Sequence, residues 1–70
     1  MSHRLHSTLN PAGDLYGSYA DAKGAAQQMV RNLTQQGFTQ VGYAVAPRPD
    51  WIHMRNLKTG EKVEIWITVD

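Results

Sequence analysis

The residues best suited to molecular recognition lie in one short segment, DWIHMRNL. In a strand, successive side chains point to opposite faces, so Ile52 and Met54 would share one face and Trp51, His53 and Arg55 the other. The first pair is apolar and suits a core. The second set combines an aromatic anchor with groups that bind carboxylate or phosphate oxygens, and Arg binds them through two parallel N–H donors. The segment therefore predicts a recognition surface on a strand.

The last segment of the chain, KVEIWITV, repeats this alternation. Its inward set is apolar: Val63, Ile65, Ile67 and Val69. Lys62, Glu64 and Trp66 then point outward, so both tryptophans share the outer face. Two interpretations stay open. The indoles form a recognition patch, because exposed tryptophans are favoured anchors at interfaces. Alternatively, they stack on each other and stabilise the sheet by about 0.2–1 kcal/mol per cross-strand pair.

Four cations follow one another closely in the chain: Arg48, Arg55, Lys58 and Lys62. Only Asp50 and Glu61 oppose them within this stretch. These cations could follow the backbone of a single-stranded nucleic acid while the indoles stack on its bases. The formal net charge of only +1, and a sequence without an RNP-type string, argue against this interpretation. Binding of single-stranded nucleic acid is therefore the second interpretation, behind protein binding.

These positions also have plain structural interpretations. His53 and Arg55 fit a solvated strand face, with Arg55 over an indole ring in a cation–π contact. Arg48 lies in PRPD, whose prolines donate no backbone hydrogen bond. Such a loop stops strand pairing at a sheet edge, which we favour, or it inserts its arginine into a groove of a partner.

The chain shows no catalytic or metal-binding constellation. It contains no cysteine, and its carboxylates are scattered over turns, a helix start, a strand face and the C-terminus. His3 and His6 are three residues apart, which places their rings on opposite faces of a strand, and we expect this terminus to be frayed. We therefore expect no catalysis, no metal site and no cofactor.

One helix and four extended segments are predicted. The helix in SYADAKGAAQQMVRNLTQQG has Ser18 as N-cap, Asp21 in its first turn and Gly37 at its end. Its inward face is apolar: Ala22, Ala25, Ala26, Met29, Val30 and Leu33. HRLHSTL precedes the helix, followed by a turn at NPAGD with Leu15 and Tyr16 packed beneath it. FTQVGYAVA, WIHMRNL and KVEIWITV follow the helix, with a turn at KTGE.

This order, β-α-β-β-β, predicts an α+β fold in which a single helix packs on one face of a mostly antiparallel sheet of three to four strands. Residues 1–70 make one small domain, with 41% hydrophobic residues. No segment approaches the roughly 18 apolar residues of a membrane span, and no signal peptide is recognisable, so we expect a cytoplasmic protein. A chain of this size buries only about 60% of its unfolded surface, and a homodimer would supplement its core.

The order of these segments resembles that of small phage and mobile-element inhibitors, particularly compact type I anti-CRISPR proteins. The resemblance rests on SYADAKGAA after an N-terminal strand, followed by FTQVGYAVA, WIHMRNL and KVEIWITV. It is a similarity of architecture and size over most of the chain, without a diagnostic motif. It implies a protein that binds a host complex and blocks it. The nearly balanced charge argues against mimicry of nucleic acid, which needs a negative field.

We therefore predict a non-enzymatic protein-binding module that blocks a host protein by steric occlusion. The predicted contact surface is the sheet face that the helix leaves open: Trp51, His53, Arg55 and Trp66, with Arg48 and Lys62. The same face would also suit a homodimer. The polar side of the helix is the other surface that the sequence leaves open: Lys23, Gln27 and Arg31.

Overall fold

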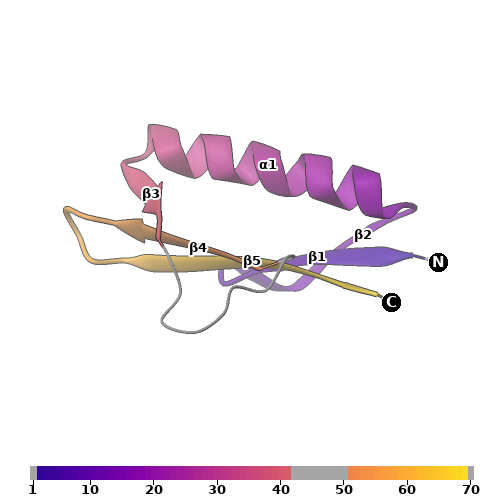
Figure 1. Ribbon diagram of the computed structural model, residues 1–70. Helices are drawn as coiled ribbons and strands as arrows, with labels where there is room; N and C mark the ends of the chain where they lie inside the picture. The colour runs from indigo at the N-terminus through magenta and orange to yellow at the C-terminus, as the bar shows by residue number, and fades with distance from the viewer. Residues whose placement is uncertain (1, 42–50, 70) are drawn as a thin grey trace.

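The computed structural model describes residues 2–41 and 51–69, which form an antiparallel sheet and one helix. The elements are β1 (His3–Ser7), β2 (Asn10–Tyr16), α1 (Tyr19–Gln35), β3 (Phe38–Gln40), β4 (Trp51–Asn56) and β5 (Lys62–Val69). The strands pair in the order β2-β1-β5-β4-β3, and α1 runs along one face of the sheet (Figure 1). The predicted α+β class is confirmed. The sheet has five strands, however, where the sequence predicts three to four.

The additional strand is β2, which occupies the segment predicted to be a turn. The reversal is tighter than expected, because Ser7 already pairs with Asn10. Pro11 is tolerated because β2 is an edge strand, where one row of backbone groups needs no partner. Gly13 adopts a φ of 80°, which a glycine reaches without strain. Its position is close to an irregularity in the β1–β2 register, between Leu5 and Ser7.

The core lies between α1 and the face of the sheet that α1 covers, which we call the inner face. Its buried side chains come from every layer: Leu5, Ala22, Ala26, Leu33, Phe38, Met54, Val63 and Ile65. The predicted alternation in β4 and β5 is confirmed at these positions, and Ile52 and Ile67 pack against the same cluster. Val69 is 58% exposed, because it lies at the end of β5 beside His3. Tyr16 packs against the core, whereas Leu15 is 54% exposed and lies opposite Arg4 on the other face.

Both predicted ends of the helix are confirmed. Ser18 is the N-cap, and its hydroxyl oxygen accepts a hydrogen bond of 3.1 Å from the Asp21 N–H. Gly37 follows the C-cap with a φ of 98°, the left-handed conformation that commonly ends a helix. The inward alanines Ala22 and Ala26 are only 0% and 2% exposed, so α1 approaches the sheet closely at its first turns.

Ser18→Ala is expected to reduce the free energy of unfolding by about 1 kcal/mol, because the Asp21 N–H loses its acceptor. In a domain of this size, the melting temperature would fall by roughly 4–8 °C. Thermal unfolding followed by circular dichroism measures this change. Ser18→Asp retains an acceptor at the same position and should melt close to the wild type. An equal loss in both variants would show that the cap contributes nothing at this helix end.

The N-terminal segment is not frayed, contrary to the expectation from the sequence. β1 is paired on both sides, with β2 and with β5, because its backbone groups complete both ladders. His3 points to the inner face, where its ring meets Tyr19 edge-on at 5.6 Å between centroids. His6, three residues later, lies on the opposite face, as the spacing predicts.

The segments that flank β4 are partly described. In FTQVGYAVA, β3 covers Phe38–Gln40, and the Val41 N–H donates to the His53 carbonyl at 3.0 Å. Residues 42–46 and the PRPD loop with Arg48 lie outside the described residues. The predicted turn at KTGE is confirmed, and Gly60 in it has a φ of 78°. Within the described ranges, no helix is long and apolar enough to cross a membrane.

Candidate recognition surface on the outer face of the sheet

The face of the sheet opposite α1, which we call the outer face, carries the residues that the sequence singled out. Cross-strand pairing between β4 and β5 sets Trp51 against Trp66, His53 against Glu64, and Arg55 against Lys62. Partners in an antiparallel pair share a face, so the structure brings five of the predicted contact residues together. Those five are Trp51, His53, Arg55, Lys62 and Trp66. Arg48 lies outside the described residues.

Three rings form a stack across three neighbouring strands, which we call the aromatic ladder: His6, Trp66 and Trp51. The Trp51 and Trp66 rings lie 5.0 Å apart between centroids and 11° from parallel. The His6 and Trp66 rings lie 5.3 Å apart and 9° from parallel. The order follows from the register, because His6 pairs with Trp66 on one side of β5 and Trp51 pairs with it on the other. The two indoles therefore stack on each other, as one of the two sequence interpretations predicts, and they remain half-buried on the outer face.

The aromatic ladder determines which part of each ring a ligand can reach. Trp66 lies between His6 and Trp51, so both faces of its ring are covered by other rings. A ligand approaching the outer face from solvent meets the edge of this indole. Stacking of a nucleic-acid base needs an open ring face. The central position of the ladder therefore suits edge contacts with a protein better than stacking with a base.

His6 is held at the end of the ladder by two hydrogen bonds that sequence reasoning did not foresee. Its Nδ1 lies 2.8 Å from the Pro11 carbonyl oxygen and its Nε2 lies 2.7 Å from the Thr68 hydroxyl. Because a carbonyl oxygen only accepts, Nδ1 is the donor to Pro11, while the Thr68 hydroxyl can serve Nε2 as either donor or acceptor. The imidazole of His6, in β1, therefore contacts both neighbouring strands: β2 through Pro11 and β5 through Thr68. The alternation in HRLHS, which puts His6 opposite Leu5, was the signal that could have placed it on this face.

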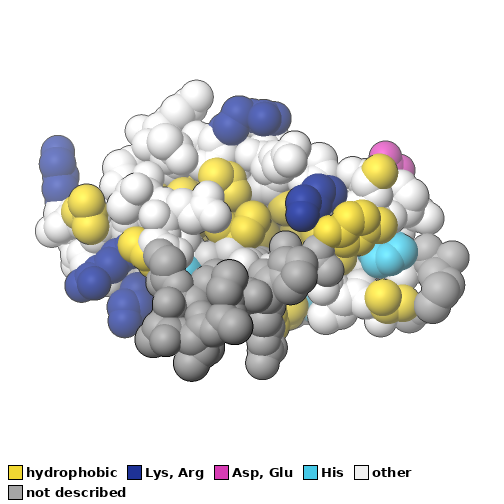
Figure 2. Space-filling view, viewed as in Figure 1, with side chains coloured by type: hydrophobic (Ala, Val, Ile, Leu, Met, Phe, Trp, Pro, Cys, Tyr) yellow, Lys and Arg dark blue, Asp and Glu magenta, His cyan; other side chains and the backbone are white. Residues whose placement is uncertain are grey.

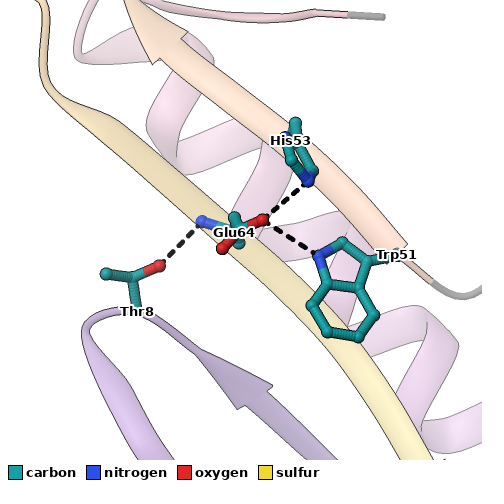
Figure 3. Close-up of polar contacts among 4 residues, drawn as sticks. All are labelled: Thr8, Trp51, His53 and Glu64. Atoms are coloured by element: carbon teal, nitrogen blue, oxygen red, sulfur yellow. Dashed lines mark hydrogen bonds and ion pairs between the residues drawn. The ribbon is translucent and has the colours of Figure 1, made fainter. Parts of the chain in front are cut away.

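Glu64 is the centre of a second polar cluster (Figure 3). Its Oε1 lies 2.7 Å from His53 Nε2 and accepts a 3.3 Å hydrogen bond from Trp51 Nε1. Its backbone N–H donates to the Thr8 hydroxyl at 2.9 Å. One carboxylate oxygen therefore fixes the orientation of both an indole and an imidazole, which stiffens this part of the outer face. Sequence reasoning placed Glu64 on this face but did not foresee that it joins the two predicted contact residues.

Beside this cluster, the surface is hollowed over a volume of about 560 Å³. The lining residues lie in β4 and β5 or directly follow β1 and β3: Thr8, Val41, His53, Met54, Arg55, Lys62, Val63 and Glu64. Met54 and Val63 line it although their side chains are buried in the core on the inner face. The side chains of Arg55, Lys62 and Glu64 are charged and border the hollow. A volume of this size is in the range of about 300–1,000 Å³ that ligand sites occupy.

Arg55 and Lys62 are both exposed and lie directly opposite each other across β4 and β5. No hydrogen bond or ion pair joins either side chain to another described residue. Lys58 lies in the turn that connects the two strands, and Figure 2 shows Lys and Arg side chains gathered at this end of the molecule. The cation–π contact considered for Arg55 is not formed, since His53 and Glu64 separate it from the paired indoles.

The described parts of the chain hold no group of three or more His, Cys, Asp or Glu side chains that could bind a metal ion. The outer face instead combines an aromatic ladder with a hollow that is bordered by a fixed carboxylate and a pair of cations. The chain matches no protein-family model, no curated protein and no solved structure, so its function has to be inferred from the residues and their arrangement.

Proposed function

We propose that the protein is a non-enzymatic module that binds a protein partner through the outer face of its sheet. The observation that carries this proposal is the aromatic ladder beside two exposed cations, on the face that α1 does not cover. Aromatic and Arg side chains are the usual centres of binding energy at protein interfaces. The contacts of His6 and Glu64 hold the ladder in place before a partner arrives, which lowers the entropy lost on binding.

The finer form of the proposal is an inhibitor that occupies a site on a host complex. Its support is the resemblance in size and in element order to small phage inhibitors. A rigid face with a central aromatic group can block a partner's site without any chemistry. The complexes that such inhibitors block are cytoplasmic, and the proposal places the protein in that compartment. Self-association through the same face would give a homodimer, and the measured mass in solution distinguishes the two outcomes.

Single-stranded nucleic acid remains the second candidate ligand of the outer face. The cations Arg55, Lys58 and Lys62 favour it, because they lie at the same end of the sheet. The covered ring faces of Trp66 and the net charge of +1 favour a protein. Fluorescence titration with a single-stranded oligonucleotide at low and moderate salt separates the two ligand classes. A steep loss of affinity with salt, together with quenched tryptophan emission, would favour nucleic acid.

Charge reversal on the outer face is expected to weaken capture of the partner strongly. Arg55→Glu should reduce its recovery from a host lysate at least about tenfold, as expected for a central interface arginine worth more than 1.4 kcal/mol. Arg31→Glu is the matched control, because Arg31 is also an exposed arginine but lies on the polar side of α1. Recovery is measured by quantitative mass spectrometry of the bound fraction. Equal recovery with Arg55→Glu and with the wild type would exclude the outer face as the contact surface.

A further inference from the structure

We infer that Arg55 and Lys62 form a binding site for one carboxylate of the protein partner, an Asp or Glu side chain that enters the hollow between β4 and β5. This inference rests on the proposed function and names the chemistry that the partner presents at one point of the interface.

The first argument comes from the register of the sheet. Arg55 and Lys62 are a directly opposed cross-strand pair, and like charges in this arrangement destabilise a sheet. Neither side chain is paired with a described acidic residue. A fold usually avoids such a local conflict, and conflicts of this kind are concentrated at functional sites. An anion bound between the two cations would remove the repulsion.

The second argument is that the neighbouring acidic side chains do not serve this role. Oε1 of Glu64 is occupied by His53 and Trp51, at 2.7 and 3.3 Å. Glu61, in the turn, forms no ion pair of 4.0 Å or less with a described cation. The two cations therefore face the hollow without a counter-ion from the described chain.

The third argument concerns the charge of the ligand. The hollow is bordered by the charged side chains of Arg55, Lys62 and Glu64, which together carry one net positive charge. A carboxylate carries a single negative charge and matches this balance. A phosphate monoester carries about −1.5 to −2 charges, which exceeds this balance, and Glu64 would repel it more strongly than it repels a carboxylate. Arg binds either group through two parallel hydrogen bonds, so the charge balance is what favours a carboxylate over a phosphate at this site.

The aromatic ladder, on the same face as the hollow, offers a contact for an apolar neighbour of the acidic side chain. His53 lines the hollow. Its ring and the indole of Trp51, at the end of the aromatic ladder, both contact the same carboxylate oxygen of Glu64. A partner segment with a hydrophobic residue next to its acid could place the acid between Arg55 and Lys62 and the apolar side chain along the edges of the indoles.

The test uses two dipeptides that differ in one group, N-acetyl-leucyl-glutamate amide and N-acetyl-leucyl-glutamine amide. Each is titrated into the 15N-labelled protein and followed by two-dimensional amide NMR. The glutamate peptide should shift the amides of Thr8, Arg55, Lys62 and Glu64 in a saturable way, with a dissociation constant on the order of 1 mM. The glutamine peptide should bind at least fivefold more weakly. Equal binding of both, or shifts spread over the whole chain, would overturn the inference.

The variant pair Arg55→Gln/Lys62→Gln should lose the response to the glutamate peptide. It should also melt no lower than the wild type, because it removes a repulsive pair. Lys23→Gln/Arg31→Gln removes the same number of charges from the polar side of α1 and should keep the full response. If the first double variant retained the shifts, the site would not consist of these cations.

Inorganic phosphate supplies the remaining comparison. Phosphate that shifts the same amides while the glutamate peptide does not would overturn the carboxylate assignment.

The proposed function is tested separately by partner capture. Capture lost with Arg55→Glu, without any response to the glutamate peptide, would reject the carboxylate site and leave the outer face as the contact surface. Capture unaffected by Arg55→Glu would reject the proposed function itself.

Discussion

Gly13→Ala is expected to lower the free energy of unfolding by roughly 2–4 kcal/mol, the largest effect of any single substitution considered for this protein. Gly13 has a φ of 80°, where a side chain is strained. A Cβ at this position would also lie 2.7 Å from the Leu5 carbonyl oxygen and 2.8 Å from Arg4 Cγ. The carbonyl belongs to the backbone of β1, so it can move only by disturbing the pairing of two strands.

The matched control for this prediction is Gly24→Ala. Gly24 lies in α1 with nothing within 4 Å of the added Cβ, so alanine there should stabilise the protein by about 1 kcal/mol. Urea unfolding followed by far-ultraviolet circular dichroism measures both variants under the same conditions. The two substitutions are chemically identical and should shift the midpoint in opposite directions. A stable Gly13→Ala protein would mean that β2 does not approach β1 as described.

Trp66→Ala is expected to reduce the free energy of unfolding by roughly 2–3 kcal/mol. Trp66 is half-buried and stacks on two rings, one on each side. Each aromatic pair contributes about 0.5–1.5 kcal/mol beyond the buried area. Removing the central ring therefore removes both stacks and leaves His6 and Trp51 without a common neighbour.

Trp66→Phe and Leu57→Ala show whether the aromatic ladder causes this loss. Phenylalanine can keep both stacks, so Trp66→Phe should lose less than half as much stability as Trp66→Ala. Leu57 is 74% exposed, so its replacement should change stability by no more than about 0.5 kcal/mol. Chemical unfolding at several denaturant concentrations gives all three values. A loss with Trp66→Phe as large as that with Trp66→Ala would mean that ring stacking is not the stabilising contact.

The elements whose apolar residues recur at regular spacing were predictable from the sequence. In α1, the apolar spacing, the Ser18 cap and Gly37 each indicate the same helix, and in β4 and β5 the period of two gives the correct faces. β2 was missed because Pro11 and Gly13 are typical of turns. The edge position that makes them acceptable in a strand depends on the pairing order of the sheet. That order is a property of the whole fold.

The outer face could be predicted only in part, because some of its contacts also depend on how the strands pair in the whole fold. The alternation of side chains along β4 and β5 is enough to place four residues on one face: Trp51, His53, Arg55 and Trp66. The aromatic ladder also needs the register between β1 and β5, which pairs His6 with Trp66 from opposite ends of the chain. The hydrogen bond from Trp51 to Glu64 likewise depends on side-chain geometry at one cross-strand position. Local sequence patterns carry no information about either contact, so neither the role of His6 nor the bridge through Glu64 could be predicted.

The aromatic ladder has a structural role, and binding of a partner is the role that we propose for it in addition. It stabilises the sheet on the side that α1 does not cover, which matters in a chain of 70 residues. The same stacking holds the indoles rigidly, with their edges toward solvent. Substitution of Trp66 would therefore change stability and binding together. The exposed cations Arg55 and Lys62 are better positions for testing binding alone, because they make no contact that the fold requires.

The most direct test of the outer face as the contact surface is photo-crosslinking in host cells. A photoreactive amino acid is placed at position 39, whose residue pairs with Arg55 across β3 and β4, or at position 27, on the polar side of α1. Both positions are exposed. Position 39 should form a covalent adduct with the partner, and position 27 should form none. Adducts from position 27 without adducts from position 39 would assign binding to the helix and contradict a contact surface on the outer face.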